Sequence, residues 1–76
     1  MTFERIEINP AIMLGKPVIR GTRIPVETLL RKLSEGASEA DLMEAYPRLT
    51  REDIQAALAY AADSLAHETI VVPPAS

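Results

Sequence analysis

The absence of cysteine from a chain of only 76 residues constrains this protein more than any single motif. A domain of this size buries about 60% of the surface that its unfolded chain would expose, so it is marginally stable alone. Without cysteine it has no disulfide and no thiolate metal site, and its single histidine excludes a multi-histidine metal cage. We therefore expect one domain without a metal or cofactor, stabilised by self-association or by a partner.

Two further patterns concern the location of the protein. No apolar run approaches the roughly 18 to 20 residues that a membrane-spanning helix requires. The N-terminus also lacks the basic region and following apolar run of a secretory signal. The sequence therefore predicts a cytoplasmic protein that does not enter a membrane.

Charge is divided unequally along the chain. Residues 1–32 hold six cations and three carboxylates, a local balance of +3, whereas residues 33–76 hold two cations and eight carboxylates, a balance of −6. Such a division is typical of a protein with two partner surfaces, one of them for a polyanion. The alternative is an ordinary solvated surface, and the charges alone do not decide between the two.

The first third of the chain predicts short strands. Residues 3–8 alternate apolar and charged side chains, which indicates a half-buried strand that Asn9-Pro10 ends. Residues 17–20 and 23–25 flank Gly21-Thr22, and glycine in the first position of a two-residue loop suits a type II′ hairpin turn. We therefore predict an N-terminal strand followed by a β-hairpin.

Three helices are predicted after the hairpin. Apolar residues at helical spacing indicate a helix over residues 26–35, which Gly36 terminates. Ser38 is a helix N-cap for a second, short helix that Pro47 ends near Tyr46. Thr50 caps a longer third helix, whose predicted buried stripe is Ile54, Ala57, Leu58, Ala61 and Leu65.

This order predicts a mainly α fold. Residues 1–68 would form a single small helix-turn-helix domain of the winged-helix or homeodomain-like type, with three helices after the strand and hairpin. Residues 69–76 would be a short C-terminal tail that contains a strand at Thr69, Ile70, Val71 and Val72. Three short helices also suit a plain structural bundle, so the outline alone does not indicate DNA binding.

The stretch GKPVIRGTRIPV, residues 15–26, resembles the signature of the bacterial domain-of-unknown-function family 433. Further similarity lies in LSEG (33–36), AYPRLT (45–50) and DIQAALAYA (53–61), so the resemblance spans about residues 5–66. It implies a helix-turn-helix-like domain that serves as a VapB-type antitoxin against a small PIN-like ribonuclease toxin.

The candidate DNA-binding residues come from two regions. Lys16, Arg20 and Arg23 surround the predicted hairpin, where guanidinium groups can bind phosphate. Alternatively, Arg20 and Arg23 pair with carboxylates of the same fold or of a second subunit. Arg48, Arg51 and Gln55 lie at the start of the third helix, and Arg51 and Gln55 are residue types that read guanine and adenine. The acidic residues of this helix oppose DNA binding, so it is alternatively a dimer or partner face.

Other sites are less well supported by the sequence. Gly15-Lys16 is not a phosphate-binding P-loop, because Pro17 stands where that loop needs Ser or Thr. Asp63 and His67 share helical spacing, but two ligands do not complete a metal site. No nucleophile lies beside a base in a known motif, so we do not expect an enzyme.

Three functions remain open. The first is an antitoxin that binds a PIN-like ribonuclease toxin and its own operator DNA, with residues 69–72 adding a strand to the partner. The second is a stand-alone DNA-binding transcription regulator. The third is a structural homodimer that binds neither DNA nor a toxin.

Overall fold

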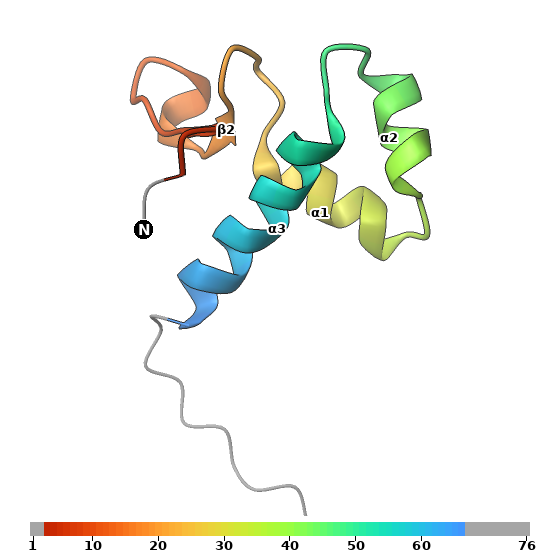
Figure 1. Cartoon of the computed structure of the whole chain (residues 1–76). Helices are drawn as coiled ribbons and strands as arrows, with labels where there is room; N and C mark the ends of the chain where they lie inside the picture. Colours follow the sequence, from red (N-terminus) through yellow and green to blue (C-terminus); the bar gives the residue numbers. More distant parts are fainter. Residues whose placement is uncertain (1–2, 67–76) are drawn as a thin grey trace, which may run out of the picture.

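The computed structural model describes residues 3–66, which form a small, mainly helical domain (Figure 1). Its elements are β1 (Ile6–Glu7), the short 3-10 segment η1 (Met13–Gly15), β2 (Val18–Ile19), α1 (Val26–Ser34), α2 (Glu39–Ala45) and α3 (Arg51–Ala66). Helix α3 packs against α1, α2 and β1, so it connects the helical part of the domain to the sheet. The three predicted helices are confirmed: the first two lie within one residue of their predicted ends, and the third begins directly after its predicted cap, Thr50.

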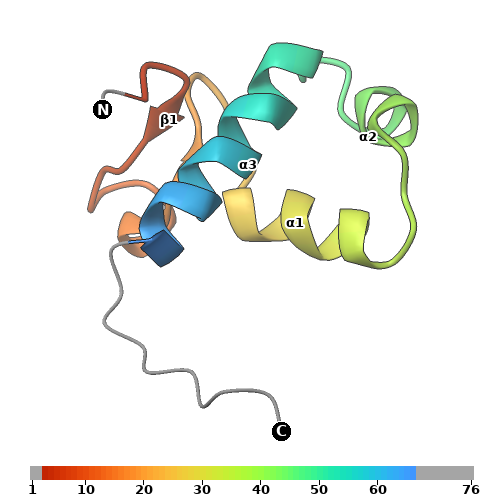
Figure 2. The same ribbon diagram turned by 60° about the horizontal axis from the view of Figure 1, so that its bottom comes forward.

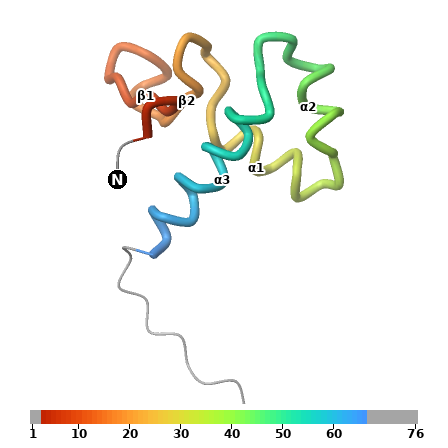
Figure 3. Tube along the Cα trace, in the orientation of Figure 1, coloured from red at the N-terminus to blue at the C-terminus, as the bar shows by residue number. Residues whose placement is uncertain are grey.

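The sheet is smaller than predicted and is paired differently. β1 and β2 are antiparallel, with Ile6 opposite Ile19 and Glu7 opposite Val18, and Figure 3 shows the two segments side by side. The predicted strand over residues 3–8 is thus reduced to two residues. The second arm of the predicted hairpin contributes one isolated bridge, between Val18 and Pro25. The tight turn is present, but the strand that continues the sheet is β1.

The turn at Gly21 differs from the predicted type. The Thr22 amide donates to the Ile19 carbonyl at 3.0 Å, so Arg20 and Gly21 are the two central residues of the turn. Gly21 has a φ of +80°, and Arg20 is not among the residues with positive φ. Positive φ at the second central position defines a type II turn, whereas type II′ requires it at the first. Glycine is therefore needed here as predicted, but one position later in the turn.

Helix α2 begins with a reciprocal cap. Ser38 accepts a hydrogen bond from the Asp41 amide through its hydroxyl, and the Asp41 carboxylate accepts one from the Ser38 amide. This capping box satisfies two amides that the first turn leaves without intrahelical partners. It confirms the predicted start of the second helix at Ser38.

The core lies where β2 meets the three helices. Its largest fully buried side chains are Ile19, Leu29, Leu42, Ile54 and Val18. Two residues of the predicted buried stripe on α3 are instead exposed, Leu58 at 45% and Leu65 at 62%. Figures 1 and 2 show the last turns of α3, which contain Leu65, extending away from α2. Leu58 lies earlier in the helix, beside the buried Ala57, and is exposed at the flank of the buried face.

The connection from β1 to β2 contains an unusual backbone conformation. Met13, Leu14 and Gly15 have φ values of +51°, +58° and +83°, a left-handed run that includes two residues with a Cβ. A left-handed conformation costs such a residue roughly 1–2 kcal/mol. Leu14 is also 95% exposed. Burial of the Leu14 side chain therefore does not offset the free-energy cost of its left-handed conformation.

Within residues 3–66, no helix combines the length and the apolar character needed to cross a membrane.

Candidate functional site

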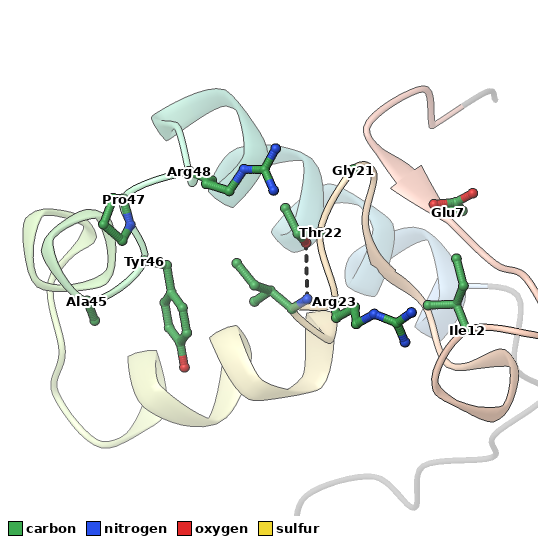
Figure 4. A pocket seen from close by; sticks show the side chains of 10 residues that line it. Glu7, Ile12, Gly21, Thr22, Arg23, Ala45, Tyr46, Pro47 and Arg48 are labelled. Carbon is green, nitrogen blue, oxygen red and sulfur yellow. Dashed lines mark hydrogen bonds between the residues drawn. The ribbon is translucent and has the colours of Figure 1, made fainter.

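A cleft of about 580 Å³ lies between the Gly21 turn and the connection from α2 to α3 (Figure 4). The turn contributes Gly21, Thr22 and Arg23, and the helix connection contributes Tyr46, Pro47 and Arg48. The cleft therefore unites two of the sequence segments that carry the family resemblance, although they are some 25 residues apart in the chain. Glu7, Ile12, Ile24 and Ala45 complete its lining.

Arg20 is not among the residues that line this cleft. Its guanidinium Nε donates to the Glu4 carbonyl, and its NH2 group donates to the Ile6 carbonyl at 3.2 Å. The Arg20 amide also donates to the Arg5 carbonyl at 2.8 Å. The side chain therefore fastens the segment around β1 to the end of β2. Within the described residues its partners are main-chain carbonyls and not carboxylates, and its contact with phosphate stays a prediction.

Lys16 is likewise paired within the domain. Its ammonium donates to the Glu27 carboxylate at 2.6 Å and so joins the start of β2 to the first turn of α1. This hydrogen bond and the charge of Lys16 lower the pKa of Glu27 below its ordinary value. Because its charge is already matched, Lys16 is a weaker candidate for DNA contact than the sequence indicated.

The other candidate cations are free. Within residues 3–66, the side chains of Arg23, Arg48 and Arg51 are exposed and make no hydrogen bond or ion pair. Arg23 and Arg48 line the cleft, and Arg51 is the first residue of α3. Gln55 is exposed one turn later, on the same side of α3 as Arg51. Four of the six predicted DNA-binding residues are therefore available to a ligand.

The start of α3 is fixed by a cap that reaches the N-terminal arm. Thr50 and Asp53 exchange side chain to amide hydrogen bonds of 3.0 and 3.1 Å, and the Asp53 carboxylate also accepts one from Arg5 at 3.1 Å. Asp53 is only 7% exposed. The sequence indicated the cap at Thr50, but it gave no sign that Arg5 is the counter-ion of Asp53. The cap and ion pair hold the first turn of α3, and with it Arg51, against β1.

A second, more apolar groove of about 450 Å³ runs between α1 and the last turns of α3. Val26, Leu30, Ala61 and Leu65 are among its lining residues. It contains none of the free arginines, so we separate it from the candidate site.

The remaining predicted site residues fall elsewhere. Thr69, Ile70, Val71 and Val72, predicted to bind a partner, lie outside the described residues, as does His67. Over residues 3–66, no three side chains of His, Cys, Asp or Glu gather as a metal site would require.

Comparison with known proteins gives the chain a family. The model of the family described as "Protein of unknown function (DUF433)" matches residues 6–61. The uncharacterized protein y4eO of Sinorhizobium fredii is 40% identical over 58 residues, which are 76% of this chain and 26% of that protein. An uncharacterized protein of Archaeoglobus fulgidus is 54% identical over 29 residues, 38% of this chain and 81% of that protein.

The fold is also similar to a solved structure. The crystal structure of a DUF433 member from Anabaena variabilis has a TM-score of 0.77 and 40% sequence identity, covering 82% of this chain and 61% of that one. The present chain thus spans about a quarter of the Sinorhizobium protein and about three fifths of the solved Anabaena chain. The family match covers both the Gly21 turn and the helix connection, the two walls of the cleft. The chain therefore belongs to the DUF433 family of proteins of unknown function.

Proposed function

We propose that this protein binds DNA through the start of α3 and the Gly21 turn, and that it acts as the antitoxin of a bacterial toxin–antitoxin pair. In this proposal α2 and α3 form a helix-turn-helix unit in which α3 enters the major groove. Arg51 and Gln55 contact base edges, and Arg23 and Arg48 contact phosphates.

The observation that carries the DNA-binding part is the separation of the basic residues into two sets. Arg5, Lys16 and Arg20 are bound to groups of the domain itself. The side chains of Arg23, Arg48 and Arg51 make no hydrogen bond or ion pair within residues 3–66, and neither do those of Arg31 and Lys32 in the last turn of α1. Of these five unpaired cations, Arg23, Arg48 and Arg51 lie near the start of α3, where a helix-turn-helix protein approaches DNA. Free guanidinium groups gathered at one place favour a polyanionic ligand.

The first turn of α3 contains two carboxylates, but only one of them is placed to repel DNA. Asp53 is buried in the cap and paired with Arg5, so its charge is directed into the domain. Glu52 remains as the exposed carboxylate of the first turn. Two arginines and one glutamate therefore face a ligand between residues 48 and 52, a net positive surface within an acidic chain.

Fluorescence anisotropy with duplex DNA from upstream of the gene tests this part. We expect binding that weakens as salt rises, because each phosphate contact releases condensed counter-ions. Replacing Arg23 or Arg48 by Gln should reduce the slope of log affinity against log salt by about 0.9 each. Lys32→Gln, a cation outside the site, is the matched control. Affinity that all three substitutions change equally would reject this site.

The antitoxin part rests on the family resemblance and on the small size of the domain, which favours stabilisation by a partner. Co-expression with the product of the adjacent gene, followed by a pull-down, tests it. We expect a PIN-like ribonuclease to co-purify and to lose activity in the complex. If DNA binds but no such partner is captured, the protein is a stand-alone transcription regulator. The predicted homodimer is tested in parallel by light scattering of the purified protein.

A further inference from the structure

We propose that the apolar groove between α1 and the last turns of α3 binds Leu14 of a second copy of this chain, while Leu14 of the first copy enters the groove of the second. The two copies would then form a twofold homodimer, in which each contact occurs twice. The inference does not depend on DNA binding or on a toxin. Its basis is that one chain carries both an exposed leucine and an apolar groove beside it.

Leu14 is presented to solvent by an ordered turn. The Gly15 amide donates to the Ile12 carbonyl at 3.0 Å. The Lys16 amide donates to the Met13 carbonyl at 3.1 Å. These two hydrogen bonds hold the main chain on both sides of Leu14, whose side chain is 95% exposed. A side chain on such a pre-organised turn loses little main-chain freedom when a second molecule buries it.

The backbone conformation of this turn also favours a binding role. Met13 and Leu14 have left-handed φ values of +51° and +58°, which residues with a Cβ rarely adopt. Strained residues of this kind cluster at binding and catalytic sites, where the strain places a side chain that function requires. Within the described domain Leu14 is not buried, so the strain has no return there. Burial of Leu14 by another molecule would supply one.

The groove lies next to this leucine. Lys16 and Pro17 form one end of its lining, and Lys16 follows Leu14 by two positions. The Cα atoms of Leu14 and Lys16 are therefore within about 7 Å of each other. Because Leu14 is almost fully exposed, it does not occupy the groove of its own chain. An exposed side chain and an adjacent groove can be exchanged between two copies about a twofold axis, since each copy offers both.

Charge favours a second copy over other occupants of the groove. Lys16 and Glu27 are the charged residues of its described lining, and they pair with each other at 2.6 Å. The face that surrounds the groove is therefore neutral, and an identical face is not repelled by it. The cleft beside the Gly21 turn is lined by Arg23 and Arg48 with Glu7 alone to oppose them. Two copies of that cleft would repel each other.

The proposed interface and the proposed DNA-binding surface lie at opposite ends of α3. Arg51 is the first residue of the helix and Leu65 lies near its end, about 21 Å away along the helix axis. Figures 1 and 2 show the loop that contains η1 and the last turns of α3 on the side of the domain away from α2. Dimerisation through the groove would therefore leave Arg51 accessible in both copies.

Sedimentation equilibrium of the full chain tests the proposal. We expect a dimer, and we expect Leu14→Asn to raise its dissociation constant at least about a hundredfold, because two leucines leave the interface. Asparagine adopts the left-handed conformation more easily than leucine, so this variant retains the turn. Leu65→Asn, at the edge of the groove, should weaken the dimer at least about tenfold. Leu58→Asn is the matched control, an exposed leucine of α3 outside the groove lining, and should have no effect.

Isotope-filtered NOE spectra of mixed dimers of ¹³C-labelled and unlabelled chain locate the contact. We expect NOEs from the Leu14 methyl groups of one copy to the methyl groups of Ala61 and Leu65 of the other. A chain that stays monomeric at millimolar concentration overturns the proposal. A dimer that neither Leu14→Asn nor Leu65→Asn weakens overturns it as well.

The remaining outcomes separate this inference from the proposed function. If the chain is monomeric and Leu65→Asn abolishes capture of the adjacent gene's product, the groove binds that protein and not a second copy. If the dimer forms as described and no duplex binds, DNA binding is rejected and the interface stands. If a duplex binds a chain that is monomeric at millimolar concentration, the interface is rejected and DNA binding stands.

Discussion

Two arginines three positions apart, Arg20 and Arg23, have opposite roles in this domain. Arg20 donates its guanidinium hydrogen bonds to the carbonyls of Glu4 and Ile6, whereas Arg23 is exposed and makes none within residues 3–66. The sequence does not distinguish the two, because the acceptors of Arg20 are main-chain carbonyls, which no residue type in the sequence marks. Only the pairing of β1 with β2 distinguishes them.

This difference predicts opposite effects of substitution. Arg20→Gln should lower the free energy of unfolding by about 1–2 kcal/mol, because it removes charge-assisted hydrogen bonds to two carbonyls. Arg23→Gln should change that free energy by less than about 0.5 kcal/mol, because it breaks no contact. Urea denaturation of both variants measures this. Equal midpoints for the two would contradict the role given to Arg20.

At the scale of elements, the caps control where the helices begin and what they connect. The box at Ser38 is local to α2, whereas the box at Thr50 includes Asp53, which also binds Arg5 across 48 positions of sequence. Both boxes follow the same sequence pattern. The second one alone joins its helix to the N-terminal arm.

A double-mutant cycle can measure this connection. Asp53→Asn should cost about 2 kcal/mol of unfolding free energy, because it weakens a buried cap and its charged hydrogen bond. Arg5→Gln combined with Asp53→Asn should show a coupling of about 0.5–1 kcal/mol. Asp41→Asn, in the box without an arginine, is the matched control and should show no coupling to Arg5→Gln. Coupling of similar size in both cycles would rule out the Arg5–Asp53 link.

The elements also show where prediction from sequence succeeds. Helix ends were predictable because Ser38, Thr50 and Pro47 act on their own backbone or on neighbouring turns. The burial of Leu58 and Leu65 was predicted wrongly. Leu65 lies in the last turns of α3, and helical periodicity does not tell how far the neighbouring elements extend. Leu58 lies next to the buried Ala57, and periodicity does not tell how wide the buried face of the helix is. The turn type at Gly21 was also wrong, because it depends on which carbonyl the Thr22 amide meets.

For the whole molecule, the paired carboxylates predict a loss of stability in acid. Lys16 lowers the pKa of Glu27, and the Ser38 amide lowers the pKa of Asp41. A carboxyl whose pKa is lowered on folding stabilises the folded state above its ordinary pKa, and this contribution disappears as pH falls through the lowered value.

The urea midpoint should therefore fall as pH decreases below about 4.5, where Glu27 begins to protonate in the unfolded chain. Lys16→Met should make this fall shallower, since it removes the main cause of the shift at Glu27. Lys32→Met removes a cation that has no ion pair in the described domain, and it should leave the pH dependence as it is. If the curves of wild type and Lys16→Met are parallel throughout, Glu27 does not contribute to the acid sensitivity.

The candidate site forms only when segments distant in the sequence pack together. The sequence could therefore indicate its residues but not their arrangement. Arg23 and Arg48 were both named from residue type and position. That they share one cleft depends on the packing of the turn against the α2–α3 connection. Pairing within the fold was an open alternative for Arg20, but the sequence did not indicate that its partners are main-chain carbonyls or that Lys16 pairs with Glu27.

The link between Arg5 and Asp53 has a consequence for the order of events during synthesis. A chain that emerges from the ribosome with its N-terminus first exposes Arg5 long before its carboxylate partner, 48 positions later. The pairing of β1 with β2 needs only the first third of the chain, so it can form early. The N-terminal arm can be closed onto α3 only after the first turn of that helix has been translated, so this contact should be among the last to form.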